Sequence, residues 1–184
     1  MLFRLFPWIP GAPITEIGGP LYVPQLDQGA GRHDNPNAFG ALYVSRLPVS
    51  PVAERLKNLL GRSVTDQDLV REGARLSLVT IDDGALEGLI DLDDPRNLLT
   101  RGLRPSRVAT RNRDDTQPIA LALYHEGVDG FEWWSTIEAS WINVTLFEER
   151  VTDRLALAGE PEPLTLDHPA VREAAEAVGV LLST

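Results

Sequence analysis

The sequence predicts an α/β protein of the α+β type, in which helices pack against a mixed β-sheet. Strand and helix patterns both occur along the 184 residues, but they lack the regular strand–helix–strand rhythm of a doubly wound sheet. This length suffices for one hydrophobic core and is short for two full-sized ones, so we expect a single domain over residues 1–184.

The chain is expected to start as an extended arm, over residues 1–28, or with a first strand. Its apolar beginning is broken by three prolines, which exclude a helical signal or membrane-spanning segment there: Pro7, Pro10 and Pro13. The next apolar run, ALYVS at residues 41–45, follows a glycine and predicts a short strand.

A helix is predicted next, with Ser50 as its N-cap, Pro51 at its first position and Gly61 as its stop. Four apolar residues recur at helical spacing and form one stripe: Val52, Leu56, Leu59 and Leu60. Glu54 lies roughly opposite this stripe, at about 100° per residue. We therefore expect Glu54 to face solvent or a cleft.

The rest of the chain mixes strands with shorter helices. Strands are predicted at 75–81, 86–92, 130–136 and 140–149. A short helix is predicted at 65–72, with Thr65 as its cap. A second helix is predicted within 116–126 and is expected to start at Pro118. A third is predicted after a cap at Asp167 or His168. The last one belongs to a C-terminal helical extension at 150–184. The arginine-rich segment 101–113 is expected to be a solvated loop or to bind one small phosphate ligand.

Composition narrows the classes of function. A net charge of −10 disfavours direct binding of nucleic acid, whose phosphates attract basic surfaces. The absence of cysteine excludes disulfides, zinc–thiolate sites and cysteine nucleophiles, and it favours a reducing, cytoplasmic location. No histidine pair has the spacing of metal ligands, so we expect no metal. No Rossmann, Walker or serine-hydrolase motif occurs. Because the prolines interrupt the apolar N-terminal run, we also expect no membrane partner.

A glycine-rich segment and two later motifs together resemble the RES-domain family, which is named for an arginine, a glutamate and a serine. The first part is Gly31-Arg32, followed by FGALY at 39–43 and PVAE at 51–54. The second part is DGFEWWS at 129–135, followed by NVTLF at 143–147. The pattern covers residues 29–147. Family members commonly carry Tyr-Pro before the serine, where this chain has Trp133-Trp134.

The resemblance implies an ADP-ribosyltransferase-like fold and cleavage of the nicotinamide–ribose bond of NAD⁺, as a glycohydrolase or a phosphorylase. It also implies a toxin of a bacterial toxin–antitoxin system, with a helix-turn-helix antitoxin as partner. By this resemblance Arg32 would hold the pyrophosphate, Tyr43 would stack on nicotinamide, Glu54 would act on the ribose cation and Ser135 would complete the pocket.

Each of these residues also has an ordinary structural explanation. Arg32 alone would be a surface loop residue, Tyr43 a cross-strand aromatic and Glu54 a solvated helix charge, while Ser135 alone carries little information. Two other functions therefore stay open: an inactive RES-fold module that binds a nucleotide or a protein, and an ADP-ribosyltransferase that acts on a macromolecule. The sequence also leaves a homodimer open.

Overall fold

The computed structural model describes residues 1–183, which contain nine β-strands and six α-helices. The mixed α/β class is therefore confirmed. The elements form two compact units. The first unit comprises Met1–Tyr22, Val44–Asp82 and the chain from Ala156 onward, and the second comprises Val23–Tyr43 and Asp83–Leu155. The expectation of a single domain stays a prediction.

The first unit is built around strand β4 (Ala74–Asp82), which pairs along its length with β1 (Leu2–Trp8) in antiparallel register. Three two-residue strands also pair antiparallel with β4: β3 (Val70–Arg71), β8 (Ala156–Leu157) and β9 (Glu162–Pro163). Of the two expectations for the N-terminal segment, an extended arm or a first strand, the structure has the strand, in which Leu2 and Phe6 are buried and Pro7 is the residue before the last.

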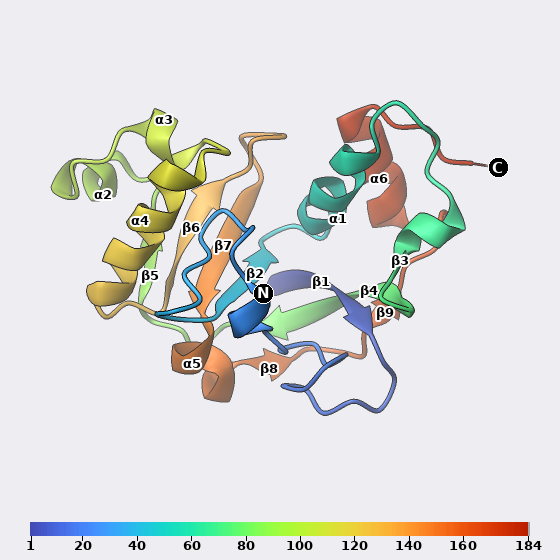
Figure 1. The fold of residues 1–184 in the computed structure, drawn as a ribbon, viewed down its shortest axis with the longest axis horizontal. Helices are drawn as coiled ribbons and strands as arrows, with labels where there is room; N and C mark the ends of the chain where they lie inside the picture. The colour runs from blue at the N-terminus through green and yellow to red at the C-terminus, as the bar shows by residue number, and fades with distance from the viewer. Residues whose placement is uncertain (184) are drawn as a thin grey trace. The chain divides into compact units, whose positions relative to one another are not determined.

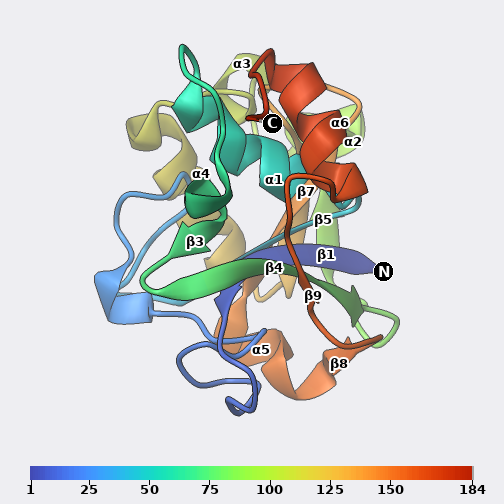
Figure 2. The same cartoon turned by 90° about the vertical axis from the view of Figure 1, so that its right-hand side faces the viewer.

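Helices α1 (Val49–Leu56) and α6 (Pro169–Val178) of the first unit lie side by side (Figure 2). The cap of α6 is confirmed, since His168 Nδ1 accepts a hydrogen bond from the backbone N–H of Ala170 at 3.2 Å. The predicted cap of α1 is wrong. Ser50 is buried inside the helix, whose N-cap is Pro48, so no side chain caps this end.

The helix predicted at 65–72 is a short 3-10 helix, Asp66–Leu69, and its predicted cap Thr65 donates from both its N–H and its hydroxyl to Asp68. A second 3-10 turn, Lys57–Leu59, extends α1 toward Gly61. Leu60 at its end is 62 % exposed, so the apolar stripe predicted for this helix is buried only at its start.

Strands β2 (Ala41–Ser45), β7 (Ile142–Phe147), β6 (Gly130–Trp134) and β5 (Leu89–Asp91) follow one another in this order. Within the second unit β6 pairs antiparallel with β7 and parallel with β5. The sequence predicts all four of these strands, although β5, β6 and β7 are shorter than predicted. Beyond Tyr43, β2 passes into the first unit, where Ser45 pairs with Phe3.

Helix α4 (Arg113–His125) lies beside β5 and β6 (Figure 1) and buries Ile119, Ala120 and Leu123 in one core with Phe131 and Trp133 of β6. It begins five residues before Pro118, because Asn112 accepts a hydrogen bond from the N–H of Asp114 and caps it. The predicted start at Pro118 is wrong, since this proline lies inside the helix.

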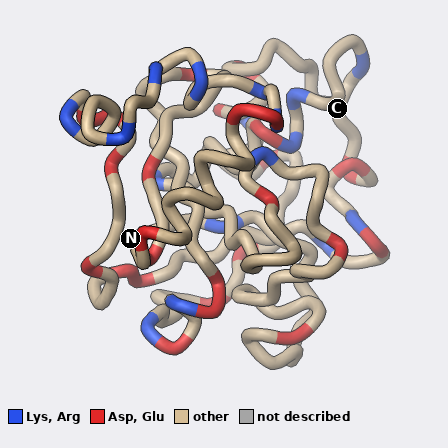
Figure 3. The backbone as a smooth tube through the Cα atoms, turned by 60° about the vertical axis from the view of Figure 1, so that its left-hand side comes forward, with Lys and Arg blue, Asp and Glu red and all other residues tan. Residues whose placement is uncertain are grey.

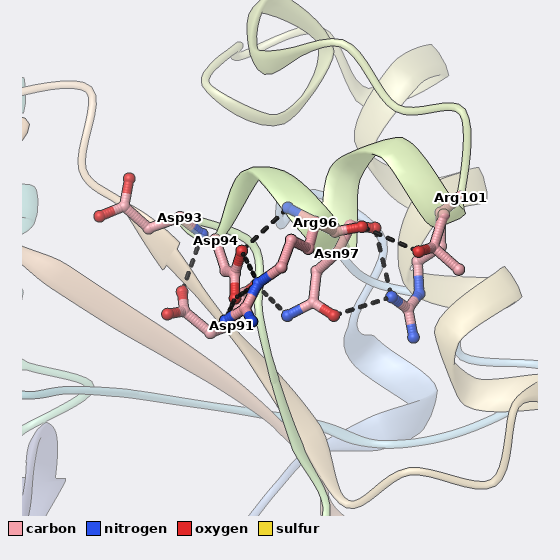
Figure 4. Close-up of polar contacts among 7 residues, drawn as sticks. Asp91, Asp93, Asp94, Arg96, Asn97 and Arg101 are labelled. Atoms are coloured by element: carbon pink, nitrogen blue, oxygen red, sulfur yellow. Dashed lines mark hydrogen bonds and ion pairs between the residues drawn. The ribbon is translucent and has the colours of Figure 1, made fainter.

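The second unit also contains three short helices: α2 (Pro95–Thr100), α3 (Pro105–Val108) and α5 (Glu148–Val151). Two 3-10 turns accompany them, Gln25–Asp27 and Thr152–Arg154. The arginine-rich segment is therefore partly helical. The residues just before this segment are held by local hydrogen bonds, as Figure 4 shows. Asp94 caps α2 by accepting from the N–H of Arg96, and the side-chain amide of Asn97 donates to the carbonyl oxygen of Asp91.

Acidic and basic residues are interspersed along the backbone (Figure 3), and several form ion pairs. Arg107 in α3, for example, binds Asp115 in α4, and Arg101 binds Glu126. Exposed pairs of this kind contribute little to stability. Within residues 1–183 no helix has the length and apolar character needed to cross a bilayer.

Candidate functional site

The loop that carries Arg32 is organised by one buried carboxylate. Asp34 is 5 % exposed and accepts hydrogen bonds from the backbone N–H groups of Gly29, at 2.8 Å, and Gly31, at 2.5 Å. Gly31 has to lack a side chain, because a Cβ there would lie 2.4–2.6 Å from the carboxylate atoms of Asp34. The glycine-rich turn thus closes around Asp34.

Helix α4 holds the same loop from its other side. The hydroxyl of Thr116 donates to the carbonyl oxygen of Arg32, and the side-chain amide of Gln117 donates to that of Gly31 at 3.1 Å. In return Asn35 donates to the carbonyl oxygen of Gln117 at 3.0 Å. The backbone on both sides of Arg32 is therefore fixed by the first turns of a helix.

The side chain of Arg32 reaches the end of strand β6. Its guanidinium carbon lies 4.6 Å from the centre of the Trp133 ring, which is within cation–π distance. Its Nη2 donates to the hydroxyl of Thr136 at 3.4 Å. Since an arginine offers five N–H groups in a planar fork, this position presents a cation suited to phosphate or carboxylate.

Tyr43, at the point where β2 leaves the second unit, is tied to this loop through its hydroxyl. The hydroxyl donates to Asp34 Oδ1 at 2.7 Å and accepts from the N–H of His33 at 2.9 Å. Its ring stacks on the His33 ring, with centroids 6.1 Å apart and planes at 25°. Burial, together with the charge of Asp34, raises the pKa of Tyr43, so this phenol is neutral at physiological pH.

His33 lies behind Arg32 and is 2 % exposed. Its Nδ1 lies 2.8 Å from the hydroxyl of Thr145, which also accepts a hydrogen bond from Trp133 Nε1 at 3.1 Å. The edges of Phe131 and Trp133 complete its surroundings, with centroids 4.8 and 5.0 Å away. Burial and the charge of Arg32 lower the pKa of His33 well below its ordinary value, so the imidazole is neutral.

Gly130, the first residue of β6, allows the close approach of β7 that builds this site. A Cβ on Gly130 would lie 2.3 Å from the carbonyl oxygen of Thr145 and 2.9 Å from the Cα of Leu146. Only glycine fits there. The D-G motif noted in the sequence therefore has a steric cause.

Ser135 follows β6 directly and is 2 % exposed. Its hydroxyl accepts a hydrogen bond from the N–H of Ile137 at 3.1 Å, and its own N–H donates to the carbonyl oxygen of Trp141 at 2.8 Å. The neighbouring Thr136 contacts Arg32. The second unit thus brings Arg32, Tyr43 and the segment of Ser135 into one region.

Glu54 belongs to the first unit, on α1, whose buried residues include Val52 and Leu56. Its side chain is 27 % exposed and forms an ion pair with Lys57, one turn along. The helical phase predicted for Glu54 is therefore consistent with its position off the buried face. An acid at this position does not interrupt the packing of the buried face of α1.

The sequence patterns did not single out His33, Asp34, Thr136 or Thr145 as site residues. One signal was present for Thr145. It alternates with Asn143 in the otherwise apolar strand β7, and both polar residues are buried, at 0 % and 5 % exposed. Two buried polar residues on one strand face need partners, and polar partners gather at sites. Among residues 1–183, no group of three or more His, Asp and Glu side chains is arranged to hold a metal ion.

Comparison with known proteins adds two positive findings. The family model of the RES domain matches residues 11–167. A solved chain from the M. tuberculosis MbcT–MbcA toxin–antitoxin complex superposes with a TM-score of 0.60 at 17 % sequence identity, covering 97 % of this chain and 88 % of the other. The likeness at this identity shows a common fold. No protein of curated function matches the chain in sequence.

Proposed function

Because the chain belongs to the RES domain family, we propose that it cleaves the nicotinamide–ribose bond of NAD⁺ and is the toxin of a toxin–antitoxin pair. The family match supports the activity, and the fold shared with a chain of a toxin–antitoxin complex supports the toxin role. The observation that carries the proposal is the fixed Arg32, a cation on a helix-anchored loop beside aromatic rings.

A site that cleaves this bond has to meet three requirements. The C–N bond between ribose and nicotinamide breaks with its electron pair on the nicotinamide, which leaves as a neutral base, and positive charge develops on the ribose ring. The site must therefore hold the pyrophosphate, seat the departing ring and place negative charge near the ribose. Water or phosphate then bonds to the ribose carbon and loses its proton, which completes hydrolysis or phosphorolysis.

In this proposal Arg32 binds the pyrophosphate through its guanidinium N–H groups. Tyr43 offers its ring to the nicotinamide. Its hydroxyl is held between Asp34 and the N–H of His33, which fixes the plane of the ring. Ser135, buried at the end of β6, supplies a hydroxyl for hydrogen bonding to the nucleotide.

Glu54 is proposed as the carboxylate that stabilises the ribose cation. A carboxylate suits this task because its negative charge attracts the positive charge that develops on the ribose. The side chain of Glu54 lies off the buried face of α1 and pairs with Lys57 one turn along.

The activity is tested by incubating the purified chain with NAD⁺ and measuring free nicotinamide, in buffers with and without inorganic phosphate. We expect release by the wild type. Glu54→Gln should lose at least a hundredfold in kcat, roughly the contribution of one well-placed charged group. Glu173→Gln, an exposed glutamate on α6, is the matched control and should retain full activity. A well-folded wild type that releases no nicotinamide would refute the proposed activity.

The toxin role is tested in cells. Expression of the wild type in the bacterial cytoplasm should deplete NAD⁺ and stop growth, whereas Glu54→Gln should do neither. Co-expression of the reading frame next to the gene, expected to encode a helix-turn-helix antitoxin, should restore both. Growth arrest without a fall in NAD⁺ would separate toxicity from the proposed reaction.

A further inference from the structure

We propose that Trp133 is a positioning residue that sets the guanidinium of Arg32 for anion binding, and that Thr145 fixes the indole ring for this purpose. The inference rests on the proposed phosphate-binding role of Arg32. It assigns a function to the tryptophan found where the resemblance leads one to expect a tyrosine.

The first step is the contact between cation and ring. The Arg32 Cζ lies 4.6 Å from the Trp133 centroid, and the indole is 5 % exposed, so the ring is held in place by its surroundings. Cation–π attraction is strongest for tryptophan and grows when water is excluded. Because this attraction acts on the charge of the whole guanidinium, it does not consume the N–H groups that a pyrophosphate needs.

The second step is the fixation of the ring. An indole N–H can only donate, and here it donates to the Thr145 hydroxyl at 3.1 Å. Thr145 is completely buried, and its hydroxyl also contacts His33 Nδ1 at 2.8 Å. Trp133 and Thr145 come from paired strands whose register places Phe131 opposite Thr145, so they are diagonal neighbours on one face of the sheet.

The third step is the backbone of Arg32. Its carbonyl oxygen is held by Thr116 of α4, and its neighbour His33 touches both Trp133 and Thr145. The backbone and the ring under the guanidinium are thus fixed by the same small cluster. A long arginine side chain otherwise loses much conformational freedom on binding a ligand, and a ring that pre-orders it reduces this cost.

A tyrosine at position 133 would change both contacts. Its ring is a weaker partner for a cation than indole, and its hydroxyl lies at a different place from the indole N–H. The tryptophan therefore gives this chain a more firmly placed arginine than a tyrosine would.

The test is a double-mutant cycle on Arg32→Ala and Trp133→Leu, with the affinity for NAD⁺ and for ADP-ribose measured by calorimetry beside kcat and KM. Trp133→Leu should weaken binding and raise KM about tenfold while kcat changes less than threefold, as expected for loss of one cation–π contact. Trp133→Phe, which keeps a ring under the guanidinium, should recover most of the affinity. In the Arg32→Ala background, Trp133→Leu should change affinity less than twofold.

Trp134→Leu is the matched control, because it removes the neighbouring indole, while within residues 1–183 the cation–π contact of Arg32 is with Trp133. This variant should leave the affinity within twofold of the wild type. Thermal unfolding of every variant shows that it is folded. If Trp133→Leu does not fold, Thr145→Val carries the test, and it should weaken binding only when Arg32 is present.

The outcomes separate the two proposals. A wild type that binds NAD⁺ without releasing nicotinamide refutes the proposed activity, and the cycle on affinity still decides the role of Trp133. Equal losses from Trp133→Leu with and without Arg32 overturn that role, as does an unchanged affinity in Trp133→Leu. A wild type that binds neither NAD⁺ nor ADP-ribose overturns both proposals.

Discussion

Replacing Asp34 by alanine should destabilise the protein more than any other single change of a polar residue in the site. The carboxylate accepts three hydrogen bonds, from the N–H of Gly29, the N–H of Gly31 and the hydroxyl of Tyr43. Hydrogen bonds to a charged group contribute about 1.5–3 kcal/mol each. The opened loop lets water reach some of the released donors, so we expect a loss of about 3–5 kcal/mol.

Asp34→Asn should cost less, about 1–2 kcal/mol, because one amide oxygen can keep the two glycine N–H groups while the Tyr43 hydroxyl loses its charged acceptor. Urea unfolding followed by tryptophan fluorescence and by circular dichroism measures both changes as shifts of the midpoint at constant slope. The larger loss corresponds to a fall of about 10 °C in Tm for a chain of this length.

Asp93→Ala is the matched control, since Asp93 is exposed and its substitution should change stability by less than about 0.5 kcal/mol. A loss below about 1 kcal/mol in Asp34→Ala would refute the reasoning, because it would mean that the loop around Arg32 does not depend on this carboxylate.

Three further outcomes are expected from the same unfolding measurements. Gly130→Ala should lose about 3 kcal/mol or more of stability, because its Cβ would overlap the Thr145 carbonyl oxygen. In Gly29→Ala the new Cβ meets no atom within 4 Å, so this variant should lose less than about 1 kcal/mol. Equal losses in the two variants would contradict the steric argument. The folded state keeps His33 neutral, whereas in the unfolded state this histidine becomes protonated below its ordinary pKa of 6.5. The free energy of unfolding should therefore keep its full value above pH 6.5 and fall by up to about 1.4 kcal/mol per pH unit below it. His33→Gln should remove this slope between pH 6.5 and 5, and an unchanged slope would assign it to another group. His168→Ala should cost about 1 kcal/mol through loss of the α6 cap, and no loss would mean that Pro169 alone starts the helix.

Periodicity and turn chemistry were enough to predict most of the elements. The strand at 41–45 and the helix after His168 are confirmed with their predicted starts, and the strand predicted at 130–136 is confirmed over Gly130–Trp134. The family was also predictable, since motifs spread from Gly31 to Phe147 carry the resemblance that the RES domain match confirms.

The errors came from signals with more than one meaning. Pro118 predicts a helix start because proline favours the first turn, but the cap is Asn112 and the proline lies inside α4. Ser50 has a capping side chain but is buried at 0 % exposure within α1. In the first case another cap begins the helix earlier, and in the second the side chain packs in the interior.

The polar part of the site was less predictable than the fold. Asp34 and His33 lie next to Arg32 in the sequence, but their importance comes from partners far along the chain, Tyr43 and Thr145. Sequence proximity does not reveal which donor a carboxylate or an imidazole will meet. Trp133 was predicted to pack in a strand, and its contact with Arg32 appears only in three dimensions.

The absence of a side chain at Gly130 also restricts the register in which β6 and β7 can pair during folding. A shift by one residue would turn Glu132 toward the apolar core. A shift by two would keep the faces but bring a residue with a Cβ against the carbonyl oxygen that now lies 2.3 Å from the ideal Cβ position of Gly130. Mispaired hairpins are therefore rejected by steric overlap, and one glycine selects the alignment in which Trp133 and Thr145 can meet.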